Sequence, residues 1–290
     1  MDDARQELLQ IKWTNNSTVA RDSQMPAAPD FAVRRFQSAA AHYCAGRAPY
    51  PAALIARTVE LLRLDRHHRV MDLGCGPAQL ALAFAPACGE VLALDPEPAM
   101  LALARQAAQG APNVRVVQGG SEDLGPQLGT FRAVTIGRAF HWMDRQETLQ
   151  RFESLLSPDG AVVLFGDDRP AIPENAWVSD YKALLERYSS DDNDHSLRRA
   201  GAFVPHVSVL LDSAFNRLEQ ISVIARHQVT LEGLIERALS QSSTSRARLG
   251  ARADELIAEI RAQAATWSPN GRFTEVLTSS ALIARRPDGG

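Results

Sequence analysis

Between residues 67 and 167 the chain alternates between short apolar runs and helix-forming segments. The apolar runs are RVMDLG, EVLALD, NVRVVQG, FRAVTIG and AVVLFG, and each ends in glycine or an acid. These runs are continuously apolar rather than alternating, as expected of strands that are buried on both faces. Strands of this kind separated by helices predict an α/β fold with a doubly wound, mostly parallel sheet.

The regular alternation of strands and helices ends after Gly166. The later pattern predicts a helix over 174–188, a long strand over 218–229, helices over 230–241 and 251–267, and a last strand over 272–287. The two late strands have no sheet of their own and would bring the first sheet to seven strands. The predicted organisation is a flexible tail (1–30), N-terminal cap helices (31–66), an α/β core (67–167), and cap insertion helices with the final strands (168–290).

Net charge, cysteine content and the absence of long apolar runs indicate the kind of partner and the cellular compartment to expect. The net charge of −3 favours neither nucleic acid nor an anionic membrane, so we expect a small-molecule substrate. The three cysteines form no C-x-x-C pair, which predicts no metal site and no disulfide framework. The N-terminus resembles no secretory signal, and no apolar run approaches the length of about 18 residues that spans a bilayer. We therefore expect a cytoplasmic protein; the sequence indicates no oligomeric state.

The segment VMDLGCGPAQ places Gly74 and Gly76 between a buried strand and a helix that starts near Pro77. Residues without a Cβ let the backbone approach a ligand, and the first turn of the helix offers free N–H groups. Asp95 ends the next strand about twenty residues later, where an acid can bond ribose hydroxyls. Strand, glycine turn, helix and second acid together predict a nucleoside site.

Two cofactors compete for this site. NAD or FAD would require a third glycine at position 79, where the chain has Gln79, and Asp72 would repel a pyrophosphate. S-adenosylmethionine has no phosphate and carries an ammonium and a sulfonium, which Asp72 can face directly or through water. The sequence favours S-adenosylmethionine; a nicotinamide-dependent oxidoreductase and a purely structural Asp72 are the alternatives.

Several segments resemble the motifs of class I S-adenosylmethionine-dependent methyltransferases: VMDLGCGPAQ, VLALDPEPAML and QGGSEDL. RAFHWMD resembles the signature Ala-Phe-His-Trp-Phe-Asp of a subgroup that acts on small molecules. YCAGRAPYP is similar to the Tyr-x-x-x-Arg-x-x-Tyr-Pro segment of the same subgroup. The resemblance covers residues 36–166 closely and continues weakly to 287. It implies a Rossmann-like methyltransferase fold with a helical cap.

Carried over residue by residue, the resemblance implies that Gly74, Cys75 and Gly76 line the methionine part of the cofactor and that Asp95 holds the ribose diol. The remaining implied contacts are adenine packing by Pro96 and Met100, the adenine edge at Ser121 and Glu122, and the sulfonium flanks at Arg138 and Ala139. Met100 could equally be a core residue of its helix.

The family often has an acid at the position of Gly120, so that contact is missing here or is moved to Glu122 or Asp123. The resemblance also implies that the N-terminal segment folds over the cofactor. Tyr43 could then contact the sulfonium through its ring, and Arg47 could pair with the cofactor carboxylate.

Substrate contacts are expected after the fourth strand and in the cap. His141 is the candidate catalytic base, because its unperturbed pKa suits proton transfer; hydrogen bonding to the cap or backbone is the alternative. The candidate substrate-binding residues are Tyr50, Trp142, Trp177, Tyr181, Gln241, Ser242 and Ser243. The predicted function is methyl transfer to an O, N or C atom of a small metabolite, and a non-catalytic S-adenosylmethionine-binding regulator is the alternative.

Overall fold

The computed structural model of the chain describes residues 38–189 and 204–287, so the tail expected over residues 1–30 lies outside the described residues. Its centre is a seven-stranded sheet in the order β3-β2-β1-β4-β5-β7-β6. Strands β1 to β5 pair in parallel, and β7 runs antiparallel to β5 and β6. The predicted doubly wound, mostly parallel sheet is confirmed. Its strands are β1 (Arg69–Leu73), β2 (Glu90–Asp95), β3 (Val114–Gln118), β4 (Phe131–Gly137), β5 (Leu156–Asp168), β6 (Arg217–Thr230) and β7 (Arg272–Arg285).

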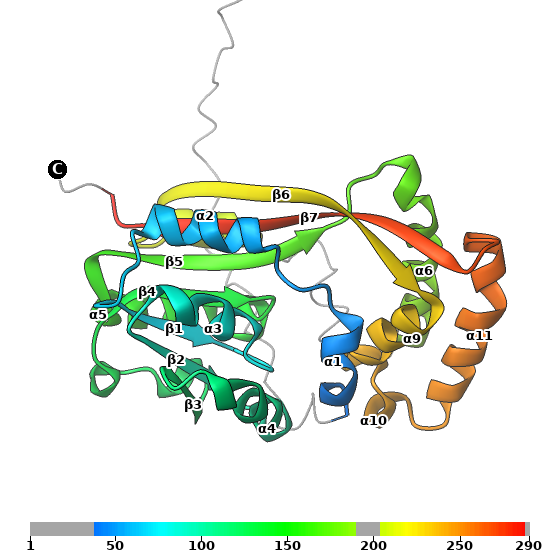
Figure 1. The fold of residues 1–290 in the computed structure, drawn as a ribbon, viewed down its shortest axis with the longest axis horizontal. Helices are drawn as coiled ribbons and strands as arrows, with labels where there is room; N and C mark the ends of the chain where they lie inside the picture. Colours follow the sequence, from blue (N-terminus) through cyan, green and yellow to red (C-terminus); the bar gives the residue numbers. More distant parts are fainter. Residues whose placement is uncertain (1–37, 190–203, 288–290) are drawn as a thin grey trace, which may run out of the picture.

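Helices cover both faces of the sheet (Figure 1). Successive residues of β1 enter opposite apolar clusters: Val70 packs under α2 (Ala52–Leu62), α3 (Gln79–Phe84) and α4 (Pro98–Ala107), while Met71 packs toward α5 (Arg145–Leu155) and α8 (His206–Leu211). Burial on two faces explains the continuously apolar strands. Over residues 38–189 and 204–287, none of the helices has the length and apolar character needed to cross a bilayer.

The start of β5 differs from the sequence prediction. The apolar run AVVLFG predicts a strand over 161–166, whereas β5 begins at Leu156 and also includes the preceding residues SPDG. Leu156 pairs with Phe131, and the register shifts between Phe131 and Ala133. The extra residues of β5 fold back on themselves at this irregularity, since a Cβ on Gly160 would lie 2.9 Å from the carbonyl oxygen of Ser157.

β6 and β7 extend beyond the sheet. β7 pairs with β5 only over 278–285, whereas it pairs with β6 over its whole length, 272–285. The excess forms a two-stranded ribbon that leads into a second layer of helices (Figure 1). We call this layer the cap: α6 (Ala176–Ser189), α9 (Leu231–Leu239), α10 (Arg246–Leu249) and α11 (Arg252–Trp267), with the ribbon. The cap has its own apolar cluster, which includes Phe273 of the ribbon.

The short helix α1 (Ala40–Gly46) joins the cap to the sheet. Gly46 lies directly against α9, and a Cβ at this position would come within 2.7 Å of the backbone of Arg237. His42 and Glu236 form a second link, with 2.7 Å between Nδ1 and Oε2. Helix α1 therefore packs backbone to backbone on the cap while its chain continues into the core.

Candidate active site

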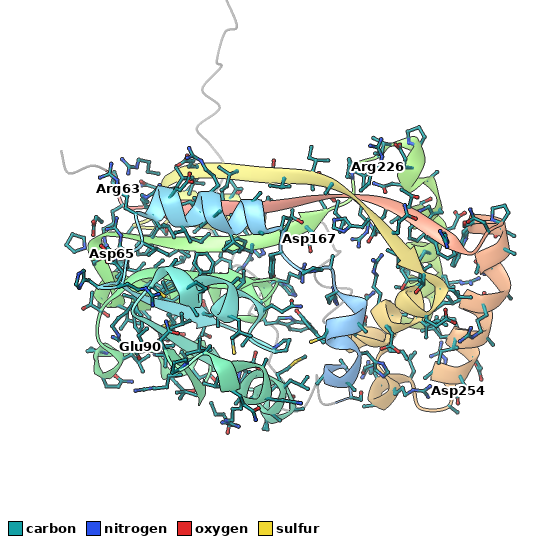
Figure 2. All side chains as sticks on the ribbon, in the orientation of Figure 1. Arg63, Asp65, Glu90, Asp167, Arg226 and Asp254 are labelled. Carbon is teal, nitrogen blue, oxygen red and sulfur yellow. The ribbon has the colours of Figure 1, made fainter. Side chains whose placement is uncertain are left out.

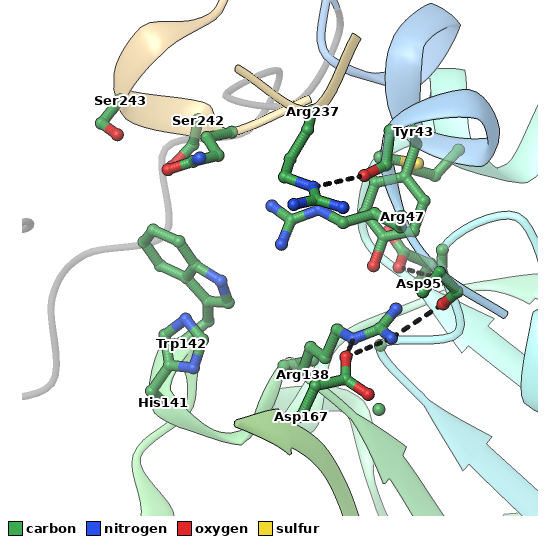
Figure 3. A pocket seen from close by; sticks show the side chains of 18 of the residues that line it. Tyr43, Arg47, Asp95, Arg138, His141, Trp142, Asp167, Arg237, Ser242 and Ser243 are labelled. Carbon is green, nitrogen blue, oxygen red and sulfur yellow. Dashed lines mark hydrogen bonds and ion pairs between the residues drawn. The ribbon is translucent and has the colours of Figure 1, made fainter. Parts of the chain in front are cut away.

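A cavity of about 670 Å³ lies between the carboxyl ends of β1, β2, β4 and β5 and the helices α1, α6 and α9 (Figure 3). Strand order reverses between β1 and β4, so this central cavity lies at the topological switch point of the sheet. Most of the residues predicted from the sequence line it. These are Tyr43, Arg47, Gly74, Gly76, Asp95, Pro96, Met100, Ser121, Glu122, Arg138, Ala139, His141, Trp142, Tyr181, Gln241, Ser242 and Ser243.

The glycine turn forms the floor of the cavity. Gly74 and Gly76 have φ values of 68° and 53°, which L side chains rarely adopt. A Cβ on Gly74 would lie 2.6 Å from the Cβ of Ala139, whereas a Cβ on Gly76 would meet nothing within 4 Å. Gly74 therefore makes room for Ala139, and Gly76 faces open space. The prediction for Cys75 is wrong: its side chain is buried in the core cluster and does not line the central cavity.

Asp95 is oriented by two backbone donors. Its Oδ2 accepts from the N–H of Gly76 at 2.8 Å, and its Oδ1 accepts from the N–H of Glu97 at 2.9 Å. Burial raises the pKa of Asp95 to about 6 against the lowering effect of these two bonds. Each oxygen keeps a further lone pair for a ligand. Two fixed acceptors beside a side-chain-free turn match a vicinal diol, so the residues present fit the ribose of S-adenosylmethionine.

The expectation that Asp72 faces the ligand is corrected. Asp72 is 1 % exposed and is absent from the lining of the central cavity. Its Oδ2 accepts from the N–H of Ala81 and its Oδ1 from the hydroxyl of Thr135, both at 3.0 Å. The apolar position raises the pKa of Asp72 to about 7. The carboxyl group ties β1 to α3 and β4 and does not touch the ligand space directly.

The part of the cavity lined by Pro96 and Met100 suits an adenine ring. Pro96 and Met100 supply its apolar surface, and Met100 is 3 % exposed. A Cβ added to Gly120 would clash with the carboxylate of Glu122. The Glu122 carboxylate therefore occupies the space that a side chain at position 120 would fill. Asp123 instead accepts from the N–H of Gly120 at 2.9 Å. The geometry favours Glu122 over Asp123 for the adenine edge.

Arg138 follows β4 and is held in a strained conformation, with φ of 58°. Its Nε donates to Asp167 at 2.7 Å and its Nη2 to the carbonyl of Ala48 at 2.9 Å. The ring of Tyr50 lies 4.5 Å from the Arg138 guanidinium and packs edge-on against Phe165. Tyr50 does not line the central cavity, so its prediction as a substrate contact is wrong: its ring supports Arg138.

The RAFHWMD segment is anchored at two of its residues, Phe140 and Asp144. Phe140 is buried, and Asp144 caps α5 by accepting from the N–H of Glu147 at 2.9 Å. The three residues between these anchors, His141, Trp142 and Met143, line the cavity, and the ring centroids of His141 and Trp142 lie 5.0 Å apart. Figure 3 shows them across the cavity from Arg47 and Arg237. The motif therefore presents two rings to the ligand space.

Of the two aromatic residues predicted in the cap, Tyr181 lines the cavity and Trp177 does not. The hydroxyl of Tyr181 donates to the carbonyl of Leu234 at 2.7 Å. The prediction for Trp177 is wrong, because this side chain packs 5.3 Å from Phe273 in the cap cluster. Its Nε1 is already used, donating to the carbonyl of Thr274 at 2.9 Å.

Helix α1 brings Tyr43 and Arg47 to the roof of the cavity. The Arg47 guanidinium lies 5.7 Å from the Tyr43 ring, and its Nε donates to the hydroxyl of Ser240 at 3.1 Å. Burial lowers the pKa of Arg47, but an arginine keeps its charge under such conditions. The roof therefore offers a cation and an aromatic face, as expected for a carboxylate and a sulfonium.

Sequence reasoning missed five charged residues of the cavity wall: Asp167, Arg169, Lys182, Glu186 and Arg237. Asp167 lies near the middle of the view in Figure 2, and its side chain is 12% exposed, whereas Arg63, Asp65, Arg226 and Asp254 lie toward the edge of the view. Asp167 carried a usable signal, since it ends a buried strand as Asp95 does. Arg237 had a weaker one, an arginine among the apolar residues of an amphipathic helix.

Comparison with known proteins agrees with this site. Residues 70–160 match a family model described as a methyltransferase domain. A Mycobacterium tuberculosis protein named as an uncharacterized methyltransferase is 25% identical over 207 residues, which cover 71% of this chain and 76% of that protein. A demethylmenaquinone methyltransferase of Thermus thermophilus is 32% identical over 136 residues, 45% of this chain and 60% of that enzyme.

Comparison with solved structures finds the same fold. A solved structure from Anaeromyxobacter dehalogenans, described as a type II methyltransferase, superposes with a TM-score of 0.51 at 22% identity and covers 83% of this chain and 97% of that one. The matched segment contains the glycine turn, Asp95 and the RAFHWMD loop. Residues 70–160 thus form a class I methyltransferase domain, and the chain is an S-adenosylmethionine-dependent methyltransferase.

Proposed function

We propose that this enzyme methylates an O, N or C atom of a small metabolite and belongs to the small-molecule subgroup that the RAFHWMD segment resembles. The observation that carries the proposal is the central cavity itself, which continues from the glycine turn to walls supplied by α1, α6 and α9. Its volume of about 670 Å³ is within the range of small-molecule sites. A cytoplasmic location stays a prediction.

The chain's own residues would bind and align. S-adenosylmethionine, when bound, supplies a methyl group already activated by the sulfonium. Asp95 would hold the ribose, Glu122 the adenine edge, and Arg47 the carboxylate of the cofactor. An in-line displacement then needs an aligned acceptor and exclusion of water, which the roof formed by α1 provides.

His141 would serve as a base where the acceptor must lose a proton. It lines the cavity on the short turn after β4, beside Trp142. We expect His141→Ala to lower turnover while the affinity for S-adenosylhomocysteine stays within about twofold, because the change removes a proton acceptor and leaves the ribose and adenine contacts in place. His67→Ala is the control, since His67 is exposed on the turn before β1. Unchanged turnover in His141→Ala would assign this residue to structure.

The acceptor class can be tested without knowing the acceptor. The enzyme is incubated with methyl-labelled S-adenosylmethionine and a cell extract divided by ultrafiltration into small molecules and retained macromolecules. We expect the label in the small-molecule fraction. Label confined to retained protein or nucleic acid would contradict the proposal, and so would cofactor binding without transfer to either fraction, which would favour a regulatory protein.

A further inference from the structure

The half of the central cavity that faces the cap carries an excess of positive charge. Its basic side chains, counted over the described residues, are Arg47, Arg138, Arg169, Lys182 and Arg237. The carboxylates that face or anchor them are Asp167, Glu186 and Glu275. Five cations against these three anions leave two positive charges; the two other carboxylates of the lining, Asp95 and Glu122, are those assigned to the ribose and the adenine edge.

Glu275 holds two of these arginines, Arg169 and Arg237, in place. It lies on the ribbon of β7 and is fully buried. Arg237 pairs with it through both terminal nitrogens, at 2.9 and 2.5 Å, and Arg169 adds its Nε at 2.8 Å. Burial alone would raise the pKa of Glu275, but these bonds lower it, so the carboxylate is ionised. One anion shared by two arginines leaves a net positive charge fixed to the cavity wall.

Arg169 has unused donors. Its Nε is taken by Glu275, while its two terminal nitrogens have no hydrogen-bond partner among the described residues. The terminal nitrogens of Arg47 are likewise without a partner in the part of the chain that the structure describes, since Ser240 takes its Nε. Each guanidinium therefore keeps a pair of parallel donors, the geometry that binds a carboxylate with two hydrogen bonds.

The two arginines lie on different sides of the cavity. Arg47 accompanies Tyr43, which also borders Gly74 at the glycine turn. That position suits the carboxylate of the cofactor, but the cofactor also carries an ammonium and a sulfonium, so it brings no net negative charge into the cavity. Arg169 follows β5 and is anchored to the ribbon beside Arg237. The group formed by Arg169, Arg237 and Glu275 therefore places one net positive charge on the substrate side.

We propose that the methyl acceptor is a carboxylic acid and that Arg169, backed by Arg237 on Glu275, binds its carboxylate. The inference rests on the proposed function, because it assumes that the cofactor occupies the glycine-turn half. One net positive charge matches a monoanion. Arg169 is the specificity-determining residue, and the carboxylate is an anchor that need not itself be methylated.

The test measures binding rather than turnover. Titration with S-adenosylhomocysteine comes first, because a wild-type protein that does not bind it would contradict the cofactor assignment itself. The cofactor-saturated protein is then challenged in thermal denaturation with short aliphatic and aromatic monocarboxylates, each beside its primary amide. We expect carboxylates to raise the melting temperature and amides to leave it unchanged.

Variants then locate the anchor. Arg169→Gln should weaken carboxylate binding by about tenfold or more, the loss of a charge-assisted pair, with unchanged affinity for S-adenosylhomocysteine. Arg169→Lys should restore part of the response, because the charge remains and the fork is lost. Arg226→Gln is the matched control, an exposed arginine paired with Glu174.

Three results would overturn the inference. The first is a melting temperature that rises equally with acids and amides, or with neither. The second is a wild-type response to carboxylates in Arg169→Gln. The third is the loss of both S-adenosylhomocysteine and carboxylate binding in Arg169→Gln. The last would place Arg169 in the cofactor site.

Discussion

At the scale of single residues, three aspartates at the ends of buried strands perform three different tasks. Asp72 is 1 % exposed and bonds the backbone of Ala81 and the hydroxyl of Thr135. Asp95 borders the cavity with two backbone donors behind it. Asp167 is neutralised by Arg138. Similar sequence positions therefore give a structural tie, a ligand acceptor and a counterion, because the partner on the neighbouring element decides the role.

Asp95→Asn is expected to weaken S-adenosylhomocysteine binding by about 1–3 kcal/mol, since an amide has one acceptor oxygen where the carboxylate has two. The wild-type pKa of about 6 adds a pH signature. Protonation below that pH removes an acceptor, so wild-type affinity should fall as pH drops from 7 to 5. The variant should show no such fall. Calorimetric titration across this range measures both effects.

Asp65→Asn serves as the control for that titration, because Asp65 is exposed on the turn before β1. It should bind the ligand as the wild type does at every pH. An Asp95→Asn protein with wild-type affinity would place the ribose elsewhere in the cavity.

Asp72 governs stability rather than binding. Its folded pKa of about 7 lies above the ordinary 3.8, so the folded state holds a proton that the unfolded state releases near pH 4. The free energy of unfolding should therefore fall as pH rises from 4 to 7, by at most about 4 kcal/mol from this group. Asp72→Asn keeps an acceptor for Ala81 and a donor for Thr135. Denaturant unfolding at pH 5 and 8 should show the variant gaining stability over the wild type at pH 8; an unchanged difference between the two pH values would refute the assignment.

At the scale of elements, the contact between α1 and α9 decides how the cavity is roofed. Gly46 is required there by close approach rather than by a special φ, since a Cβ would lie 2.7 Å from the backbone of Arg237. Arg47 follows immediately and bonds Ser240 just after α9. The position of the cofactor-facing arginine therefore depends on a glycine that touches no ligand.

Gly46→Ala should separate the two helices, destabilise the fold by about 1–3 kcal/mol and weaken S-adenosylhomocysteine binding, because overpacking displaces Arg47. Gly110→Ala is the matched control, since a Cβ there would meet nothing within 4 Å. Denaturant unfolding and ligand titration are measured on both variants. Equal behaviour of the two would show that the α1–α9 contact does not hold the roof.

Elements were easier to predict than contacts. Apolar runs located central strands such as β1 and β2, because burial on both faces leaves a pattern in adjacent residues. The edge strand β6 has no buried residue and was located as a long strand-like segment. The glycine turn and Asp95 were recognisable because the strand, turn, helix and acid occur at fixed spacings. Asp72 was misjudged because its partner Thr135 is 63 residues away in sequence. Arg169 escaped notice for the same reason, since Glu275 reaches it only through pairing of the ribbon.

At the scale of the whole molecule, the cavity spans two bodies with separate apolar cores. The clusters on the sheet contain none of the residues that form the cap cluster. The ribbon of β6 and β7 and helix α1 link these bodies (Figure 1). A ligand that contacts the glycine turn on one side and Arg47 on the other therefore adds a third link, which should couple the cap to the sheet.

Hydrogen exchange measures that coupling directly. On adding S-adenosylhomocysteine we expect slower exchange both at the sheet, in residues 73–78 and 95–100, and at the roof, in residues 40–47 and 231–243. The roof should respond because ligand contact with Tyr43 and Arg47 suppresses local opening of α1 from α9. The surface helix α11 should change little, since it lines no part of the cavity. Protection confined to the sheet would mean that the cofactor is held by the core alone, and that the cap closes only when the acceptor arrives.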